Sequence, residues 1–346
     1  MIFRANTMKI LLSGYHNPHF LTVTEYMENA IKDLGHDIIV FDDRQHIIPG
    51  RLRQRIPWLH QLDLQHINKK IVKLTLKTRP DVAIVTGGHR IDRKAIDRLN
   101  ENGICTVLWT IDAPRDFQPI IDVAHLYKYV FCQGSEAVEL LEAADIKGAR
   151  WLPMACDPEL HHPLELSEEE KHQYGNDVVF VGSYYPNRAA LLERLIGFDL
   201  GIWGPGWEQL EKGSRLRNYI KAAHSKPSEW LKIYSASKVV LATHYQDPEK
   251  RFPVYQASPR SFEALACGAF VISDAQRDVF KLFQKGVHLE VFYDVDDLKK
   301  KIQYYLNRPE DRLRIARQGR QEVVNHHTYV KRIEKLLSIV MRNQKK

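Results

Sequence analysis

The sequence has little cysteine and no long hydrophobic run. No apolar stretch reaches the ~18–20 residues that a bilayer-spanning helix requires, and the first residues lack the apolar core of a signal peptide. The four cysteines form no C-x-x-C pair; they are Cys105, Cys132, Cys156 and Cys267. These absences predict a cytoplasmic protein whose thiols are free and buried, in a reducing compartment.

Metal-binding and cofactor-binding patterns are also missing. The candidate ligand pairs are immediate neighbours, at Asp42-Asp43, His161-His162, Asp296-Asp297 and His326-His327. Adjacent side chains are poorly placed to chelate one ion. No G-x-G-x-x-G motif follows the first predicted strand. We therefore expect no metal site and no bound cofactor.

Positive charge is present in moderate excess. A formal net charge of +7 over 346 residues suits an anionic ligand, an acidic membrane surface or a nucleic acid, and decides between none of them. Much of it lies in residues 51–55, in residues 69–77 and near the C-terminus. Solvated helix faces are the simpler interpretation of such runs. A peripheral contact with an acidic membrane or with nucleic acid is the alternative.

The first half of the chain alternates short apolar runs with segments of helical periodicity. Apolar runs bounded by turn residues predict strands, and the periodic segments between them predict helices. The predicted strands span residues 8–13, 37–41, 81–85, 104–109, 129–132 and 151–154. The predicted helices span residues 22–34, 58–78, 92–102, 117–126 and 135–144. This alternation is typical of a parallel sheet that is covered on both faces.

A second alternating unit follows an irregular segment. Residues 156–176 contain Pro158, His161, Pro163 and an acidic run, and we expect them to be an exposed linker. Further strands are predicted at residues 178–181, 200–203, 239–242, 270–273 and 288–292. Further helices are predicted at residues 187–196, 227–235, 294–306, 309–325 and 329–341, and around residue 263. The predicted fold class is α/β, with two Rossmann-like, doubly wound parallel-sheet domains and a ligand at the carboxyl ends of the strands.

Residues 260–272 are the most informative stretch. An amphipathic helix, with Phe262 and Leu265 inward, runs into Gly268 and a buried strand, and its single carboxylate, Glu263, is expected in the first turn. A helix N-terminus can bind an anion through its free N–H groups and its dipole. A carboxylate nearby can accept hydrogen bonds from neutral hydroxyls. Phosphate and ribose side by side are what a nucleotide-sugar donor presents.

The turn after strand 178–181 offers a second anion-binding feature. Gly182 permits close backbone approach, Ser183 offers a hydroxyl, and Arg188 offers a planar cationic fork. A tight turn with a surface arginine is the alternative. Because this turn and Glu263 lie in the same predicted domain, we favour a diphosphate site. The loop 203–207, Trp-Gly-Pro-Gly-Trp, either walls a nucleobase or caps the domain.

Several segments resemble the GT-B glycosyltransferases. Residues 260–268, Arg-Ser-Phe-Glu-Ala-Leu-Ala-Cys-Gly, are similar to the donor-binding helix of that fold, and most of all to its spore-maturation-protein-like branch. Residues 109–114, with the pattern Trp-x-x-Asp-x-Pro, and residues 134–138 and 151–158 resemble the same branch. The resemblance implies metal-independent transfer of a sugar from a nucleotide-diphosphate donor, such as a UDP-sugar, to an unknown glycan, protein or small molecule.

The resemblance also implies how the chain is divided. Residues 1–155 would form the acceptor-side domain and residues 177–325 the donor domain, facing each other across a cleft. Residues 156–176 would link them. Residues 326–346 would form a last helix that crosses back to the first domain, with Leu336 and Leu337 buried there.

Donor-binding roles follow from the resemblance as well. Glu263 would bind the ribose, and Arg188 and Arg260 would face the diphosphate. His244 opens the long loop between strand 239–242 and the Glu263 helix, and is assigned to the donor site with Gly182 and Ser183. Near the end of that loop, Gln256, Ala257 and Ser258 would offer backbone N–H groups to the phosphates. Related retaining enzymes carry a second carboxylate where this chain has Tyr255, so the sequence departs from the classical retaining pattern.

The loops of the first domain would carry the acceptor side. His16 and His19 follow the first strand, and surface loop histidines are the alternative interpretation. His89 follows two glycines after strand 81–85 and is expected to project at the cleft. Asp112 follows strand 104–109 and would act as the general base if the transfer inverts the anomeric centre. A turn residue beside proline is the alternative for Asp112.

Three other functions fit parts of this pattern. A non-catalytic two-domain nucleotide or sugar binder would use Asp112 and His89 only to orient its ligand. A glycosyltransferase acting on DNA would use the basic surface as a phosphate track. A sugar-nucleotide epimerase would share the fold. Fold likeness alone does not separate these, because function depends on the site.

Overall fold

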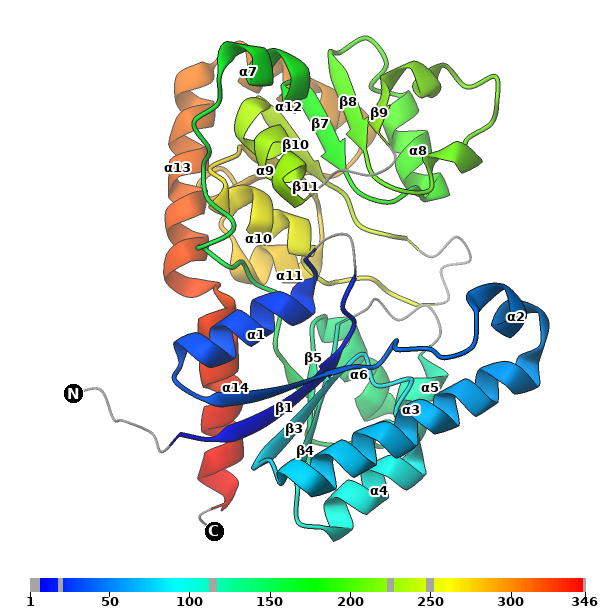
Figure 1. The fold of residues 1–346 in the computed structure, drawn as a ribbon. Coiled ribbons are helices and arrows are strands. Elements are labelled where there is room, and N and C mark those ends of the chain that lie inside the picture. Colours follow the sequence, from blue (N-terminus) through cyan, green and yellow to red (C-terminus); the bar gives the residue numbers. More distant parts are fainter. Residues whose placement is uncertain (1–6, 18–20, 112–116, 223–226, 247–251, 345–346) are drawn as a thin grey trace. The chain divides into compact units, whose positions relative to one another are not determined.

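The computed structural model describes residues 7–17, 21–111, 117–222, 227–246 and 252–344. They form two compact units, which Figure 1 follows by colour along the chain. The first unit comprises Met1–Leu152 with Arg332–Lys346, and the second comprises Pro153–Lys331. Two predicted site residues, His19 and Asp112, lie outside the described residues.

The first unit contains a parallel sheet whose strands follow the order β2-β1-β3-β4-β5-β6. Its strands are β1 (Lys9–Gly14), β2 (Asp37–Asp42), β3 (Val82–Thr86), β4 (Cys105–Thr110), β5 (Tyr129–Cys132) and β6 (Arg150–Trp151). Strands β3, β4 and β5 are buried at every position, as expected for parallel strands covered on both faces. The strand order reverses between β1 and β3, so the loops after these two strands flank the switch point of the sheet.

Helices cover both faces of this sheet (Figure 1). They are α1 (Val23–Asp33), α2 (Gly50–Arg55), α3 (Pro57–Thr78), α4 (Arg93–Glu101), α5 (Gln118–Ala124), α6 (Ser135–Ala143) and, from Arg332 onward, α14 (Tyr329–Gln344). The capping box of Thr22 and Glu25 begins α1. On α14, Leu336 and Leu337 are buried, and the Tyr129 hydroxyl donates to the Val340 carbonyl oxygen at 3.5 Å.

The second unit contains another parallel sheet, in the order β12-β11-β10-β7-β8-β9. Its strands are β7 (Val178–Val181), β8 (Leu200–Trp203), β9 (Ile220–Ala222), β10 (Val239–Ala242), β11 (Val271–Asp274) and β12 (Glu290–Phe292). The α-helices are α7 (Glu168–Tyr174), α8 (Pro186–Glu193), α9 (Pro227–Ala236), α10 (Pro259–Ala266), α11 (Arg277–Leu282), α12 (Val295–Leu306) and α13 (Pro309–His326). Two 3₁₀ helices complete the unit, η1 (Trp207–Gln209) and η2 (Arg215–Tyr219).

The predicted fold class is confirmed: two six-stranded parallel sheets carry helices around them. The sequence did not predict β9, α2, α7 and α11. Each of these spans seven residues or fewer, which is too short for hydrophobic periodicity to mark. The four cysteines are buried and are not joined in disulfides, as expected. In the described part of the chain, no helix combines the length and the apolar character that crossing a membrane requires.

The expectation that residues 156–176 are exposed and irregular holds only in part, because the segment also contains buried residues and a helix. Cys156 and His161 are fully buried, and α7 is an ordered helix with a capping box of Ser167 and Glu170. The reason is backbone pairing with a distant segment. The Cys156 N–H donates to the His327 carbonyl oxygen at 2.9 Å, and the Tyr329 N–H donates to the Cys156 carbonyl oxygen at 3.0 Å.

Candidate functional site

The candidate site lies at the switch point of the second sheet. Strands β7 and β10 are neighbours, and the chain continues from β7 to β8 on one side and from β10 to β11 on the other. Open parallel sheets bind ligands outside the carboxyl ends of the strands at such a point. The loops that begin with Gly182 and Thr243 therefore flank the site, and α10 follows the second of these loops.

Arg188 ties the two loops together. Its side chain is buried, and its two terminal nitrogens donate to the Ser183 carbonyl oxygen at 3.0 Å and to the Thr243 carbonyl oxygen at 3.1 Å. Its guanidinium carbon also lies 4.8 Å from the Tyr185 ring centre. Burial, reinforced by the nearby charge of Arg260, lowers the pKa of Arg188 to about 9. Both terminal nitrogens of the Arg188 guanidinium thus donate to backbone carbonyl oxygens. Arg188 is buried, so it is not the surface arginine of the alternative interpretation.

Arg260 is the second cation of the site. It is half-buried at the second position of α10, donates through Nε to the Val181 carbonyl oxygen, and lies 3.5 Å from both the Thr243 carbonyl oxygen and the Ser258 hydroxyl. A Cβ atom at Gly182 would lie 2.2 Å from an Arg260 terminal nitrogen. A side chain at position 182 would therefore displace the Arg260 guanidinium from this place.

Glu263 lies close to this cation. The structure begins α10 at Pro259, so Glu263 is the fifth residue of the helix and lies just past the first turn in which it was expected. Burial raises the pKa of Glu263 to about 7, although the charge of Arg260 acts in the opposite direction. Burial also raises the pKa of Tyr234 on α9, and the charge of Glu263 adds to that rise. The site thus combines two cations with one carboxyl group that ionises near neutral pH.

His244 connects three segments of the site. It is buried, its Nδ1 lies 2.5 Å from Asp274 Oδ1 at the end of β11, and its Nε2 accepts the Ser258 N–H at 2.7 Å. Burial opposes ionisation of Asp274, but its interaction with His244 outweighs burial, and the pKa of Asp274 is lowered. An Nε2 that accepts a hydrogen bond places the ring proton on Nδ1, facing Asp274.

This network changes the expectation for Ser258. Its backbone N–H was expected to face phosphate, but it donates to His244 instead. Its side-chain hydroxyl still lies beside Arg260. Ala257 precedes it and is buried. Sequence analysis did not single out Asp274 or Thr243; a polar residue directly after a buried strand is the signal that would have found them.

Three buried polar atoms of the site have no hydrogen-bond partner in the described part of the chain. They are Arg188 Nε, Thr243 Oγ1 and Ser261 Oγ. They lie on the loop and the helices that flank the switch point, where they are available to a polar ligand or to ordered water.

The tryptophan loop after β8 has a structural role. Trp207 is fully buried and donates through its indole N–H to the Gly182 carbonyl oxygen at 2.9 Å. Gly204 has a φ of +131°, and a Cβ atom there would lie 2.4 Å from the same carbonyl oxygen. Of the two interpretations left open by the sequence, the structure supports a loop that caps and braces the turn at Gly182.

In the first unit, the predicted acceptor-side residues follow β1 and β3. His16 Nε2 lies 2.5 Å from Glu28 Oε1, and both side chains are largely buried. His89 is exposed after Gly87 and Gly88, which have φ of +78° and +89°. Asp43, considered in the sequence only as a poor metal ligand, is buried after β2, and burial raises its pKa to about 6. His19 and Asp112 lie outside the described residues.

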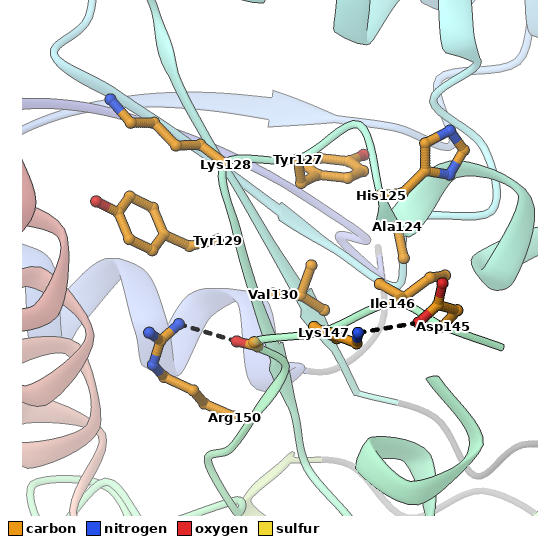
Figure 2. Close-up of a pocket in the computed structure, with 11 residues that line it drawn as sticks. Ala124, His125, Tyr127, Lys128, Tyr129, Val130, Asp145, Ile146, Lys147 and Arg150 are labelled. Atoms are coloured by element: carbon orange, nitrogen blue, oxygen red, sulfur yellow. Dashed lines mark hydrogen bonds and ion pairs between the residues drawn. The ribbon is translucent and has the colours of Figure 1, made fainter. Parts of the chain in front are cut away.

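A separate open cavity of about 460 Å³ lies at the amino ends of β5 and β6 (Figure 2). Its lining includes Lys128, Tyr129 and Arg150, and Figure 2 shows Lys147 paired with Asp145 at 3.4 Å. This is the edge of the first sheet opposite to the carboxyl ends, where parallel sheets do not bind their ligands. Among the described residues, no group of three or more histidine, cysteine or acidic side chains is arranged to hold a metal ion.

Comparisons with known proteins show which proteins this chain resembles. Residues 188–338 match a family model described as glycosyl transferase-like. The chain is similar to spore protein CgeB of Bacillus subtilis (strain 168), with 20% identity over 272 residues that cover 75% of this chain and 83% of that protein.

Solved structures show the same fold. Sucrose-phosphate synthase from Thermosynechococcus elongatus superposes with a TM-score of 0.70 at 13% identity, over 97% of this chain and 100% of the other. Anabaena Alr3699/HepE, solved with UDP and glucose, gives a TM-score of 0.64 at 15% identity over 97% and 100% of the two chains. A glycosyltransferase from Rickettsia africae gives 0.67 at 14% identity over 97% and 98%.

These findings confirm the resemblance found in the sequence. The structural likeness establishes the GT-B fold. The family match over residues 188–338 shows that the second half of the chain is similar to glycosyl transferase-like proteins.

Proposed function

We propose that the protein transfers a sugar from a nucleotide-diphosphate donor, with UDP as the expected nucleotide, to an acceptor hydroxyl. The observation that carries the proposal is the pairing of Arg188 and Arg260 beside Glu263 at the switch point of the second sheet. Two cations held close together in a partly buried site repel each other, and a bound diphosphate would offset that repulsion. Two structures that this chain resembles, HepE and an α-glucosyltransferase, were solved with UDP.

Each site residue would bind a different part of the donor. Arg260 would contact the diphosphate directly, with the Ser258 and Ser183 hydroxyls nearby. Arg188 would contribute its charge from behind the loop, because its terminal nitrogens are already bonded. Glu263, once ionised, would accept hydrogen bonds from the ribose hydroxyls. Ala257 and Gln256 would offer backbone N–H groups at the start of α10.

The transfer itself would use few protein groups. The acceptor oxygen attacks the anomeric carbon, the bond from that carbon to the diphosphate oxygen breaks, and the nucleoside diphosphate leaves. The arginines would stabilise the charge that develops on the leaving diphosphate. If the anomeric centre is inverted, Asp112 would take the acceptor proton. His89, His16 and His19 are the proposed acceptor-side groups.

A thermal-shift panel of nucleoside diphosphates and nucleotide sugars tests the proposal. A ligand present at a hundred times its dissociation constant stabilises the protein by about 2.7 kcal/mol, which is readily measured. The same panel on Arg260→Ala, with Arg194→Ala as an exposed-arginine control, shows whether binding occurs at this site. Release of UDP from a bound UDP-sugar then separates an enzyme from a non-catalytic binder. Absence of any nucleotide-dependent shift would contradict the donor assignment.

A further inference from the structure

The excess positive charge of the chain is concentrated in one segment of the first unit. Residues 44–80 contain nine lysines and arginines and a single acid, Asp63, and so carry a net charge of +8 against +7 for the whole chain. This segment runs from the end of β2 through α2 and α3. The rest of the chain is therefore close to neutral, and the function of the positive charge must be sought in residues 44–80.

The single acid of the segment does not neutralise its surface. Asp63 is buried, and its carboxylate accepts hydrogen bonds from the Ile47 N–H at 2.9 Å and contacts His46 Nδ1 at 2.8 Å and Arg53 Nε at 3.3 Å. These contacts hold the loop 44–49 and α2 against α3. The remaining cations face no acidic side chain from their own segment.

The same segment exposes large hydrophobic side chains. Trp58 is 62% exposed and Ile47 is 61% exposed, and Leu52 and Leu62 are each nearly half exposed. Monomeric proteins scatter such residues singly, so four within sixteen residues mark an interaction surface.

One outward stripe of α3 combines both features. Trp58 and Leu62 are one turn apart, and Lys69 and Lys73 continue the same stripe along the helix. The opposite stripe, which includes Ile67 and Ile71, is buried in the core of the first unit. Figure 1 shows α2 and α3 at the outside of this unit, with α3 beside α4. We call Ile47, Arg51, Leu52, Arg55, Trp58, Leu62, Lys69 and Lys73 the α2–α3 surface.

We infer that the α2–α3 surface docks on an anionic lipid bilayer. Exposed aliphatic side chains and tryptophan beside lysine and arginine are the combination that binds in the plane of a lipid interface. The cations are attracted to anionic headgroups, and the apolar side chains enter the acyl boundary. A nucleic acid would satisfy the charges but would leave Ile47, Leu52 and Leu62 without an apolar partner, so the lipid is favoured. This inference does not depend on the proposed donor chemistry.

Vesicle co-sedimentation tests the docking. The full chain is expected to sediment with phosphatidylcholine vesicles that contain phosphatidylglycerol and to remain free with phosphatidylcholine alone. Lys69→Gln and Lys73→Gln are each expected to weaken the partition about fivefold, the effect of roughly one lysine near an anionic surface. Trp58→Ser with Leu62→Ser is expected to weaken it by roughly tenfold or more. Lys300→Gln and Leu313→Ser, exposed positions of the second unit, serve as matched controls and should have no effect.

Trp58 also reports on insertion directly. It is the most exposed of the six tryptophans, so a collisional quencher in water should reach it in the free protein and lose access on the vesicle. Brominated lipid should quench it in the bound state, and Trp58→Phe should remove that signal while the protein still sediments. Equal binding to neutral and anionic vesicles, or no binding to either, would overturn the inference. Tight, strongly salt-dependent binding to a DNA oligonucleotide without vesicle binding would overturn the inference and identify nucleic acid as the partner of this surface.

Discussion

The protonation of Glu263 is the most informative single-residue property of the donor site. Its pKa in the folded protein, about 7, lies above its ordinary value of 4.5 because burial disfavours the charge. Between these pH values the folded protein holds a proton that the unfolded chain has released, so the ligand-free protein should lose stability as pH rises through this window. Glu263→Gln should remove that loss, which is on the order of 1–3 kcal/mol, in denaturant titrations across the window.

The same residue should behave in the opposite way toward the donor. Ionised Glu263 accepts hydrogen bonds that its protonated form accepts less well, so UDP affinity should rise as pH increases through about 7. Glu263→Ala should weaken UDP binding by ~1.5–3 kcal/mol, the usual range for hydrogen bonds to a charged group. Calorimetry across the pH range measures both effects. A pH profile of UDP binding that is identical in Glu263→Gln and in the wild type would exclude Glu263 from the ribose.

The two arginines should respond differently to replacement by lysine. Arg188 bridges two backbone carbonyls in a buried position, so Arg188→Lys should lower the free energy of unfolding by about 1–3 kcal/mol. Arg260 is half-buried, so Arg260→Lys should leave stability nearly unchanged and weaken UDP binding by the loss of the planar fork. Thermal unfolding and UDP titration of the same two variants check this. If Arg188→Lys and Arg260→Lys changed stability equally and also changed UDP affinity equally, the two arginines would not have the different roles proposed here.

The His244 ring can be tested through its tautomer. In Asp274→Asn, the amide N–H can donate to His244 Nδ1. The ring proton then moves to Nε2, which can no longer accept the hydrogen bond from the Ser258 N–H. We expect weaker UDP binding with a native circular dichroism spectrum. Asp177→Asn, which alters only an ion pair with Lys238 at the amino end of β7, is the matched control. Unchanged affinity in Asp274→Asn would mean that His244 does not position α10 for the donor.

At the scale of elements, the donor helix α10 depends on its contact with α13. Gly319 lies in the middle of α13, and a Cβ atom there would lie 2.1 Å from the His288 carbonyl oxygen and 2.6 Å from a methyl group of Leu265 on α10. Gly319→Ala should therefore lower stability by about 1–3 kcal/mol, despite the better helix propensity of alanine. Gly213→Ala, where nothing lies within 4 Å, is the control and should change stability little. Chemical denaturation of both variants measures the difference.

At the scale of the whole molecule, the C-terminal helix contributes to a unit far from it in sequence. Residues 332–346 group with residues 1–152, and Leu336 on α14 is fully buried. Leu336→Ala should cost about 2–5 kcal/mol through lost burial and the cavity left behind. Hydrogen exchange should show reduced protection in β5, whose Tyr129 contacts α14, with little change in β7. Equal loss of protection in both strands would mean that the two units unfold together.

Much of this architecture was readable from the chain alone because its signals are local. Apolar runs marked eleven of the twelve strands in the described part of the chain, and the segment around Glu263 indicated both the helix and the likeness to glycosyltransferases. Short elements such as β9 and α2 were missed because periodicity needs several turns or alternations to appear.

The tertiary structure decided what each site residue does. Arg188, Ser258 and His244 were all identified as site residues, but their partners come from loops that the sheet order brings together across 14 to 55 positions of the chain. The residue type determines which hydrogen bonds a side chain can make. It does not determine which partner the folded chain places beside that side chain. The sequence therefore determined the fold and the chemical groups at the switch point. Only the packed sheet decided that Arg188 and the Ser258 N–H are held by the protein itself, because a buried polar group must be satisfied by whatever the fold places beside it.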